Sequence, residues 1–291
     1  MSATLGPGLR VGHWTDSDAR TGCTVILPPR GNVTSCDVRG SSPASRELIS
    51  LHPKRRLTET HAIVLTGGSA FGLATADGVM GWLESEGIGF ETRFGIVPIV
   101  PTAGIFDLIE GRSDVRPGPD EGRAACVAAA GSFETGRVGA GTGATVGKWA
   151  GLEFASPGGL GAARVDDAGH TVHALAVVNA SGDVIGEDGQ VIAGTRATHP
   201  KLANQESFAD RAPANTVLAV VTVEGTLEKR EVAWLAARAS DGVTVSVRPA
   251  HTRFDGDVAF ALATPGSGPA DVDILGPLVT RAVAAAIRAA V

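Results

Sequence analysis

The stretch PANTVLAVVTVEG, residues 213–225, decides the fold because it passes from a polar loop straight into a run of β-branched apolar residues. Such a run predicts a buried strand at 217–223, with Asn215 and Thr216 at its entrance. Residues 199–215 are polar, contain two prolines and lack periodicity, so we expect an exposed linker there. On its own, the Asn-Thr pair is adequately explained as a turn residue followed by a β-former.

Strands and helices alternate on both sides of this stretch. Residues 62–65 form a short apolar run, Gly67 and Gly68 interrupt it, and Ser69 is placed to cap a following helix. Further helices are predicted at 119–131, 227–239 and 271–291, and further strands at 173–179 and 257–264. The class is therefore α/β or α+β, with sheet layers covered by helices.

Composition narrows the classes of function. The 291 residues are 43% hydrophobic and 19% charged, which is typical of a folded globular chain, and we expect one domain over 1–291. A net charge of −6, only 4% aromatic residues and no tyrosine argue against nucleic acid as a partner. The absence of a long apolar stretch, and of a basic segment followed by an apolar one at the start, favours a cytoplasmic protein that does not enter a membrane. The three cysteines lack metal-type spacing and are expected to be free thiols.

The glycine-rich stretch 136–151 is the most conspicuous motif. Gly139, Gly141 and Ala144 fit the pattern of dinucleotide-binding turns, but neither an apolar strand before them nor a βαβ unit around them is apparent. A phosphate-binding loop of the Walker type fails as well, because Thr142 stands where its first glycine is required. A tight structural turn is the better interpretation, and it leaves Lys148 at its end either as a surface charge or as a functional group.

A second cluster is HTRFDGDVAFALAT, residues 251–264, in which Asp255 and Asp257 stand two apart at a turn entering a strand. Carboxylates at that spacing point to one face, where they can hold a cation, orient an ammonium group or transfer protons. Two solvated aspartates in a loop are the simpler alternative. His251 is the nearest further ligand that a metal would require, and a structural role fits it better.

Thr216 also has a functional interpretation. A hydroxyl at the start of a strand can attack the carbonyl of the preceding residue, Asn215, and take over its acyl group. Water would then release a chain that begins with Thr216. The freed α-amine has an ordinary pKa near ~7.7–8.0, so it could act as general base for the hydroxyl of its own residue.

Six blocks of the sequence resemble one peptidase family in order and approximate spacing. This family contains the L-aminopeptidase/D-esterases, the β-peptidyl aminopeptidases and the endo-type nylon-oligomer hydrolases. The blocks are LTGGSAFGL (65–73), VPIVPTAGIFDL (97–108), VGAGTGATVGK (138–148), VVNASGD (177–183), NTVLAVV (215–221) and HTRFDGDVAFALAT (251–264). The resemblance implies an N-terminal-nucleophile fold of the α+β class, an αββα sandwich, matured by self-cleavage.

The resemblance also implies roles for individual residues. Thr216 would be the nucleophile and Asn215-Thr216 the cleaved bond, giving an α-chain of 1–215 and a β-chain of 216–291 that remain associated. Asn179 would help to form the oxyanion hole, and Lys148 would stand beside the nucleophile. Asp255 and Asp257 would orient its amine and hydroxyl. This set looks most similar to the threonine-using, nylon-oligomer-hydrolase side of the family.

The resulting hypothesis is an amide hydrolase that needs no metal or organic cofactor and assembles as a homo-oligomer, with a tetramer as one option. Short peptides, β-amino acid amides and linear ω-amino amides all remain open as substrates. Two alternatives also stay open: an acyltransferase of the ornithine-acetyltransferase type, and an uncleaved binding protein. Segments 39–47 and 237–252 depart from the family pattern, which affects specificity more than reaction type.

Overall fold

The computed structural model describes residues 2–198 and 215–291. The predicted linker therefore lies, apart from Asn215, outside the described residues. Within the described ranges, no helix is long and apolar enough to span a membrane.

Two five-stranded sheets form the centre of the molecule. The first has the strand order β13-β14-β17-β19-β4, and its strands are β13 (Gly159–Asp167), β14 (His170–Asn179), β17 (Thr216–Thr226), β19 (Val258–Pro269) and β4 (Val33–Val38). The second has the order β2-β3-β6-β9-β5, and its strands are β2 (Arg10–Asp16), β3 (Thr21–Leu27), β6 (Ile63–Thr66), β9 (Thr102–Gly104) and β5 (Ala44–Arg46).

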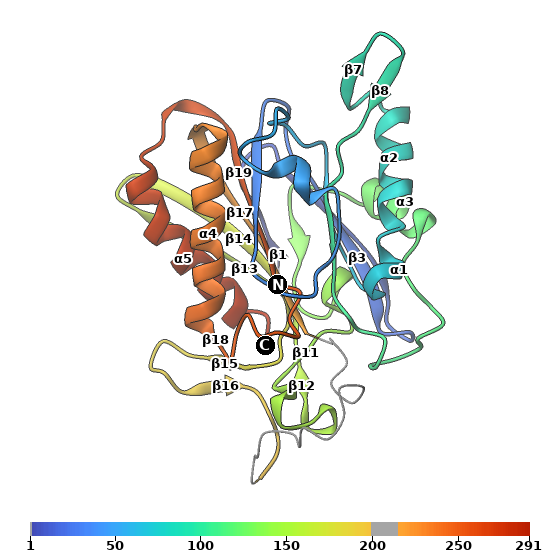
Figure 1. Ribbon diagram of the computed structural model, residues 1–291, viewed down its shortest axis with the longest axis vertical. Coiled ribbons are helices and arrows are strands. Elements are labelled where there is room, and N and C mark those ends of the chain that lie inside the picture. Colours follow the sequence, from blue (N-terminus) through green and yellow to red (C-terminus); the bar gives the residue numbers. More distant parts are fainter. Residues whose placement is uncertain (1, 199–214) are drawn as a thin grey trace.

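Helices cover the outer face of each sheet, so the layers follow in the order helix, sheet, sheet, helix (Figure 1). The helices α4 (Lys229–Ser246) and α5 (Val272–Arg288) lie against the first sheet, whereas α2 (Thr75–Ser85) and α3 (Pro119–Val127) lie against the second. This is the predicted αββα sandwich.

Short elements complete the chain. They are α1 (Ser69–Gly72), β1 (Ser2–Ala3), β7 (Phe90–Thr92), β8 (Gly95–Val97), β10 (Phe133–Glu134), β11 (Thr145–Val146), β12 (Ser156–Pro157), β15 (Asp183–Ile185), β16 (Val191–Ala193) and β18 (Val247–Arg248), with 3₁₀ turns at Leu48–Leu51, Gly139–Gly141, Lys148–Ala150 and Leu152–Phe154. In Figure 1, β7 and β8 project at the end of the molecule opposite to β11, β12, β15, β16 and β18.

The layer order explains why the run after Thr216 is apolar at every position. Val217, Ala219 and Val221 pack into the core beneath α4 and α5, while Leu218 and Val220 pack into the core between the two sheets. A strand that is buried on both faces needs apolar side chains on both, so alternation disappears.

The predicted elements all form, with shifted ends, but the start of the first helix is wrong. Ser69 was expected to cap it, yet Gly68 occupies the N-cap position with φ 76° and no side-chain cap is present. Ser69 itself has φ 55°, and the helix is divided into α1 and α2. The two glycines make a turn so tight that a Cβ on Gly67 would come within 2.1 Å of the Asp107 carboxylate.

Candidate functional site

Two neighbouring strand ends bring the first site residues together. Thr216, the first residue of β17, is the antiparallel partner of Asn179, the last residue of β14. Both side chains are buried, at 4% and 0% exposure. The pairing of two buried strands thus places a hydroxyl and an amide, 37 residues apart in sequence, in adjacent positions of one sheet.

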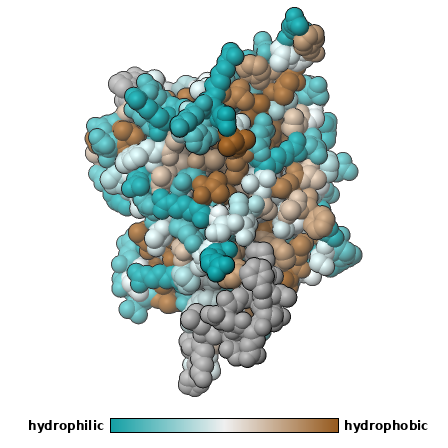
Figure 2. All heavy atoms as spheres, viewed as in Figure 1, coloured by the Kyte–Doolittle hydropathy of each residue, from teal (hydrophilic) through white to brown (hydrophobic). Residues whose placement is uncertain are grey.

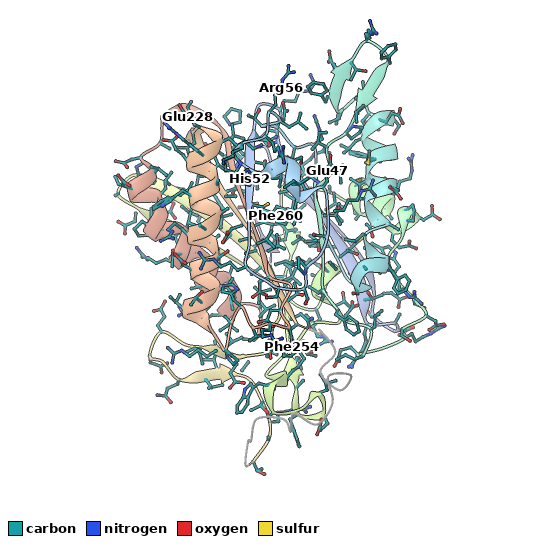
Figure 3. The ribbon with its side chains drawn as sticks, viewed as in Figure 1. Glu47, His52, Arg56, Glu228, Phe254 and Phe260 are labelled. Carbon is teal, nitrogen blue, oxygen red and sulfur yellow. The ribbon has the colours of Figure 1, made fainter. Side chains whose placement is uncertain are left out.

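The carbonyl group between Asn215 and Thr216 receives two donors. The Thr216 hydroxyl lies 2.5 Å from the Asn215 carbonyl oxygen, and the backbone N–H of Gly256 donates to the same oxygen at 2.9 Å. Asn215 also forms a parallel bridge with Asp255. A Cβ at Gly256 would lie 2.8 Å from Thr216 Oγ1, so a glycine suits this close approach. Figure 3 labels Phe254, next to this turn, and Phe260, which lies in β19 and is buried in the core.

Lys148 and Asn179 are in direct contact. The Lys148 ammonium donates to Asn179 Oδ1 at 2.7 Å and to its backbone oxygen at 3.0 Å. The backbone N–H of Thr145 donates to the same Oδ1 at 3.0 Å, and Asn179 Nδ2 donates to the Phe106 carbonyl at 3.1 Å. The amide is therefore fixed with its oxygen toward Lys148. The surface-charge interpretation of Lys148 is wrong, because its side chain is buried.

Burial also changes the protonation of Lys148. Removal from water lowers its pKa from 10.5 to about 7, although the charges of Asp255, Glu110 and Asp107 oppose this shift. With a pKa near 7, the amine can exchange a proton at neutral pH.

The two aspartates differ in their surroundings. Asp257 Oδ1 accepts the backbone N–H of Val217 at 2.7 Å, and its Oδ2 lies 2.7 Å from His251 Nδ1. Asp255 Oδ2 accepts the Thr252 N–H at 2.5 Å, whereas its Oδ1 is buried and has no hydrogen-bond partner among the described residues. Burial, followed by the charge of Asp257, raises the pKa of Asp255.

Two further residues contact this region. His251, for which a structural role is the expectation, pairs with the carboxylate of Asp257; its position six residues before Asp257 in the same block is the signal for this contact. Asp107 was not singled out at all. Its carboxylate, 3% exposed, accepts the Thr21 hydroxyl at 2.8 Å and the Gly68 N–H at 2.7 Å, so it fixes the loop whose Phe106 carbonyl holds Asn179.

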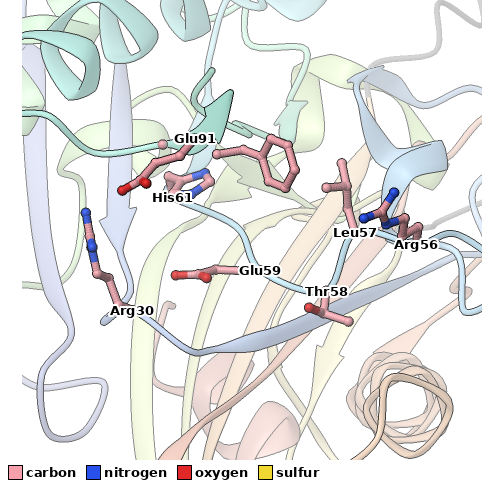
Figure 4. A pocket seen from close by; sticks show the side chains of 9 residues that line it. Arg30, Arg56, Leu57, Thr58, Glu59, His61 and Glu91 are labelled. Atoms are coloured by element: carbon pink, nitrogen blue, oxygen red, sulfur yellow. The ribbon is translucent and has the colours of Figure 1, made fainter. Parts of the chain in front are cut away.

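A pocket of about 300 Å³ lies elsewhere, at the end of the molecule where β7 and β8 project (Figure 4). It is lined by Arg30, Arg56, Leu57, Thr58, Glu59, His61, Gly89, Phe90 and Glu91. Figure 3 shows Arg56 far from Phe254, and Figure 2 shows apolar surface near the β7 and β8 end. None of the site residues predicted from the sequence lines this pocket.

Comparison with known proteins connects the site to a family. Residues 6–291 match peptidase family S58. A protein named as an uncharacterised aminopeptidase of Mycobacterium tuberculosis is 40% identical over 280 residues, which cover 88% of this chain and 79% of that protein. A 6-aminohexanoate-oligomer endohydrolase of Agromyces is 31% identical over 274 residues, covering 89% and 73% of the two chains.

Solved structures share the fold. A β-aminopeptidase of Burkholderia superposes with a TM-score of 0.74 at 21% identity, covering 98% of this chain and 84% of that one. An L-aminopeptidase D-Ala-esterase/amidase of Ochrobactrum anthropi, described as a variant of the N-terminal-nucleophile hydrolase fold, gives 0.73 at 16% identity and covers 99% and 85%. The resemblance noted in the sequence is confirmed: the chain belongs to peptidase family S58 and is a hydrolase of C–N amide bonds.

Proposed function

We propose that this amide hydrolase processes itself at Asn215-Thr216 and then uses Thr216 as its N-terminal nucleophile. The observation that carries the proposal is the buried contact of 2.5 Å between the Thr216 hydroxyl and the Asn215 carbonyl oxygen. A nucleophile must be held close to the carbon that it attacks, and the rigid start of β17 provides this.

In the cleavage step, Thr216 Oγ bonds to the Asn215 carbonyl carbon, and its proton passes to the departing Thr216 nitrogen as the C–N bond breaks. An ester and a free α-amine result. Water then hydrolyses the ester, giving the Asn215 carboxylate and restoring the Thr216 hydroxyl. The Gly256 N–H, 2.9 Å from the carbonyl oxygen, would stabilise the negative charge that develops there.

In turnover, the α-amine of Thr216 removes the proton of its own hydroxyl, which attacks the carbonyl of the substrate. The protonated α-amine then gives this proton to the substrate nitrogen as the C–N bond breaks, so that an amine leaves and an ester to Thr216 remains. Asn179 contributes to the oxyanion site through its amide group, and Lys148, bonded to the same amide, tunes the charge beside it. The Asp255 and Asp257 pair orients the nucleophile from the neighbouring turn. Water finally releases the acyl group.

Both products would stay together. β17, which would begin the 216–291 chain, lies between β14 of the 1–215 segment and β19, with hydrogen-bonded register on both sides. Its side chains enter the two largest cores. Cutting one peptide bond at the strand's first residue removes none of these contacts.

We further propose short peptides with a free N-terminus and amides of β- or ω-amino acids as substrates. The 40% identical relative is named as an aminopeptidase, and the 31% identical one as acting on 6-aminohexanoate oligomers. Turnover of a matched panel, an α-dipeptide, a β-dipeptide and a 6-aminohexanoate dimer, would rank the three classes.

Mass spectrometry of the purified chain tests the nucleophile directly. We expect a fragment that begins at Thr216, and we expect Thr216→Ala to remain one chain of 291 residues without amidase activity. Thr222→Ala is the matched control, since Thr222 is equally buried in the same strand but six residues away. A wild-type chain that stays intact on long incubation, or a Thr216→Ala chain that still splits at this bond, would contradict the proposal.

A further inference from the structure

The ring of His251 lies between two hydrogen-bond acceptors. Its Nδ1 is 2.7 Å from Asp257 Oδ2, and its Nε2 is 3.2 Å from the backbone carbonyl oxygen of Ser240 in α4. The backbone N–H of His251 points to the same carboxylate oxygen at 3.3 Å. A neutral imidazole has one N–H and can satisfy only one of these acceptors, whereas an imidazolium satisfies both.

The charges around the ring agree with this geometry. Burial lowers the pKa of His251, and the charge of Arg39 does so too, but the carboxylate of Asp257 and the Ser240 carbonyl together raise it above its ordinary value. The positive charge of Arg39 is itself taken up by Asp37 and Asp241, each at 2.9 Å. The turn also carries Asp255, whose charge favours a cation at His251, and the exposed Arg253, whose charge opposes it.

We propose that His251 is a positioning residue of the active site, an imidazolium that holds the Asp257 carboxylate in place so that Asp257 can hold the backbone beside Thr216. The assignment rests on the proposed function of Thr216. A continuous line of hydrogen bonds supports it: the Ser240 carbonyl, the His251 ring, the Asp257 carboxylate and the Val217 N–H, which follows Thr216 directly.

The hydrogen bonds of Asp257 and Asp255 indicate different roles for the two aspartates. Asp257 has both oxygens engaged, by the Val217 N–H and the His251 ring, and its charge helps to raise the pKa of Asp255. Asp255 keeps one buried oxygen without a partner among the described residues. The two carboxyl groups therefore differ in how many hydrogen bonds their oxygens accept, which allows them different roles within a site. Asp255 is then the carboxyl that meets the amine released at Thr216.

The protonation state of His251 can be measured without any catalysis. The full chain carrying Thr216→Ala stays uncut under the proposed function, and ¹⁵N NMR of its imidazoles distinguishes neutral from doubly protonated rings. Loss of a resonance in His251→Asn assigns the signal. We expect both ring nitrogens of His251 to be protonated at pH 6.5 and the titration midpoint to fall when Asp257→Asn is added. A neutral ring at pH 6, or a midpoint that Asp257→Asn leaves in place, would overturn the proposal.

Activity provides the second measurement. In the otherwise native chain, His251→Gln should lower kcat on a short amide by about 10- to 100-fold, the range seen when partners that orient metal ligands are removed. KM should change little, and His251→Asn should recover part of the loss by donating to Asp257. His173→Gln is the control, since His173 is also buried in the first sheet but lies six residues from Asn179.

The two proposals fail in different ways. If the wild-type chain never exposes Thr216, the proposed function fails while the NMR result still decides the state of His251. If the chain splits and turns over, but His251→Gln matches wild type in kcat and in its pH profile, His251 has no positioning role.

Discussion

Replacing Lys148 by methionine should remove a strong pH dependence from the free energy of unfolding. The pKa of Lys148 is lowered from 10.5 to about 7 in the folded chain. Because the folded-state pKa is the lower one, stability is fully present above pH 10.5 and is lost as the pH falls toward 7. Between these values the unfolded chain holds one more proton, so the slope is about 1.4 kcal/mol per pH unit. From pH 7 to pH 10 the free energy of unfolding should gain about 4 kcal/mol from this residue.

Urea unfolding measures the effect in a Thr216→Ala background, where the chain stays in one piece. The quantity of interest is the difference in unfolding free energy between Thr216→Ala and Thr216→Ala/Lys148→Met at pH 7, 8.5 and 10. Burial raises the pKa of the Cys36 and Cys126 thiols to about 12, which gives both chains the opposite slope above about pH 9. The contribution of the cysteines is the same in both chains and cancels when their unfolding free energies are subtracted. The sequence contains no tyrosine, so no tyrosine titrates near pH 10.

The control is Lys54→Met, because Lys54 is exposed and its loss should leave the curve unchanged. A difference between the two chains that stays constant within about 1 kcal/mol from pH 7 to pH 10 would refute the reasoning. It would mean that Lys148 stays protonated in the folded chain.

Three further changes have expected outcomes. Gly256→Ala brings a Cβ to 2.8 Å from Thr216 Oγ1 and should slow chain splitting on a denaturing gel, whereas Gly81→Ala, with open space around its Cβ, should not. Lys229→Met leaves three backbone carbonyls without their buried ammonium donor and should lower the free energy of unfolding by about 3 kcal/mol in urea titrations; a loss under 1 kcal/mol would contradict this. Asp107→Asn replaces one carboxylate oxygen, which accepts from Thr21 or Gly68, by an NH₂ group that cannot accept, and it should lower the melting temperature. A melting temperature equal to that of the wild type would show that this contact is dispensable.

Much of the architecture follows from local sequence pattern. The unbroken apolar run after Thr216 predicts a strand covered on both faces, and the structure buries its alternate side chains in two different cores. The start of the first helix fails by the same local reasoning. Ser69 is a good capping residue by type, but the backbone of Gly67 and Gly68 is held by Asp107, a residue nearly 40 positions away. Propensity carries no information about such a contact.

In the candidate site, too, some features can be predicted from local sequence and others depend on contacts between distant segments. From the sequence come the residue types and their blocks: a threonine that opens a buried strand after Asn215, an aspartate pair before another strand, and a lysine that ends a glycine-rich turn. Their mutual approach depends on the register of β14 against β17 and on the turn before β19. The sequence does not show how far a charged side chain is removed from water. The lowered pKa of Lys148 therefore could not be predicted from it.

The sequence by itself determined the layered α+β class, the family and the residue types of the candidate site, because apolar patterning and the order of the blocks can be read along the chain. Only the tertiary structure decided how these residues meet. It buries Lys148 against Asn179, separates the surroundings of Asp255 and Asp257, and brings His251 to the carboxylate of Asp257. The physical reason is that burial and hydrogen-bond partners, which set protonation, are properties of packing between segments distant in sequence.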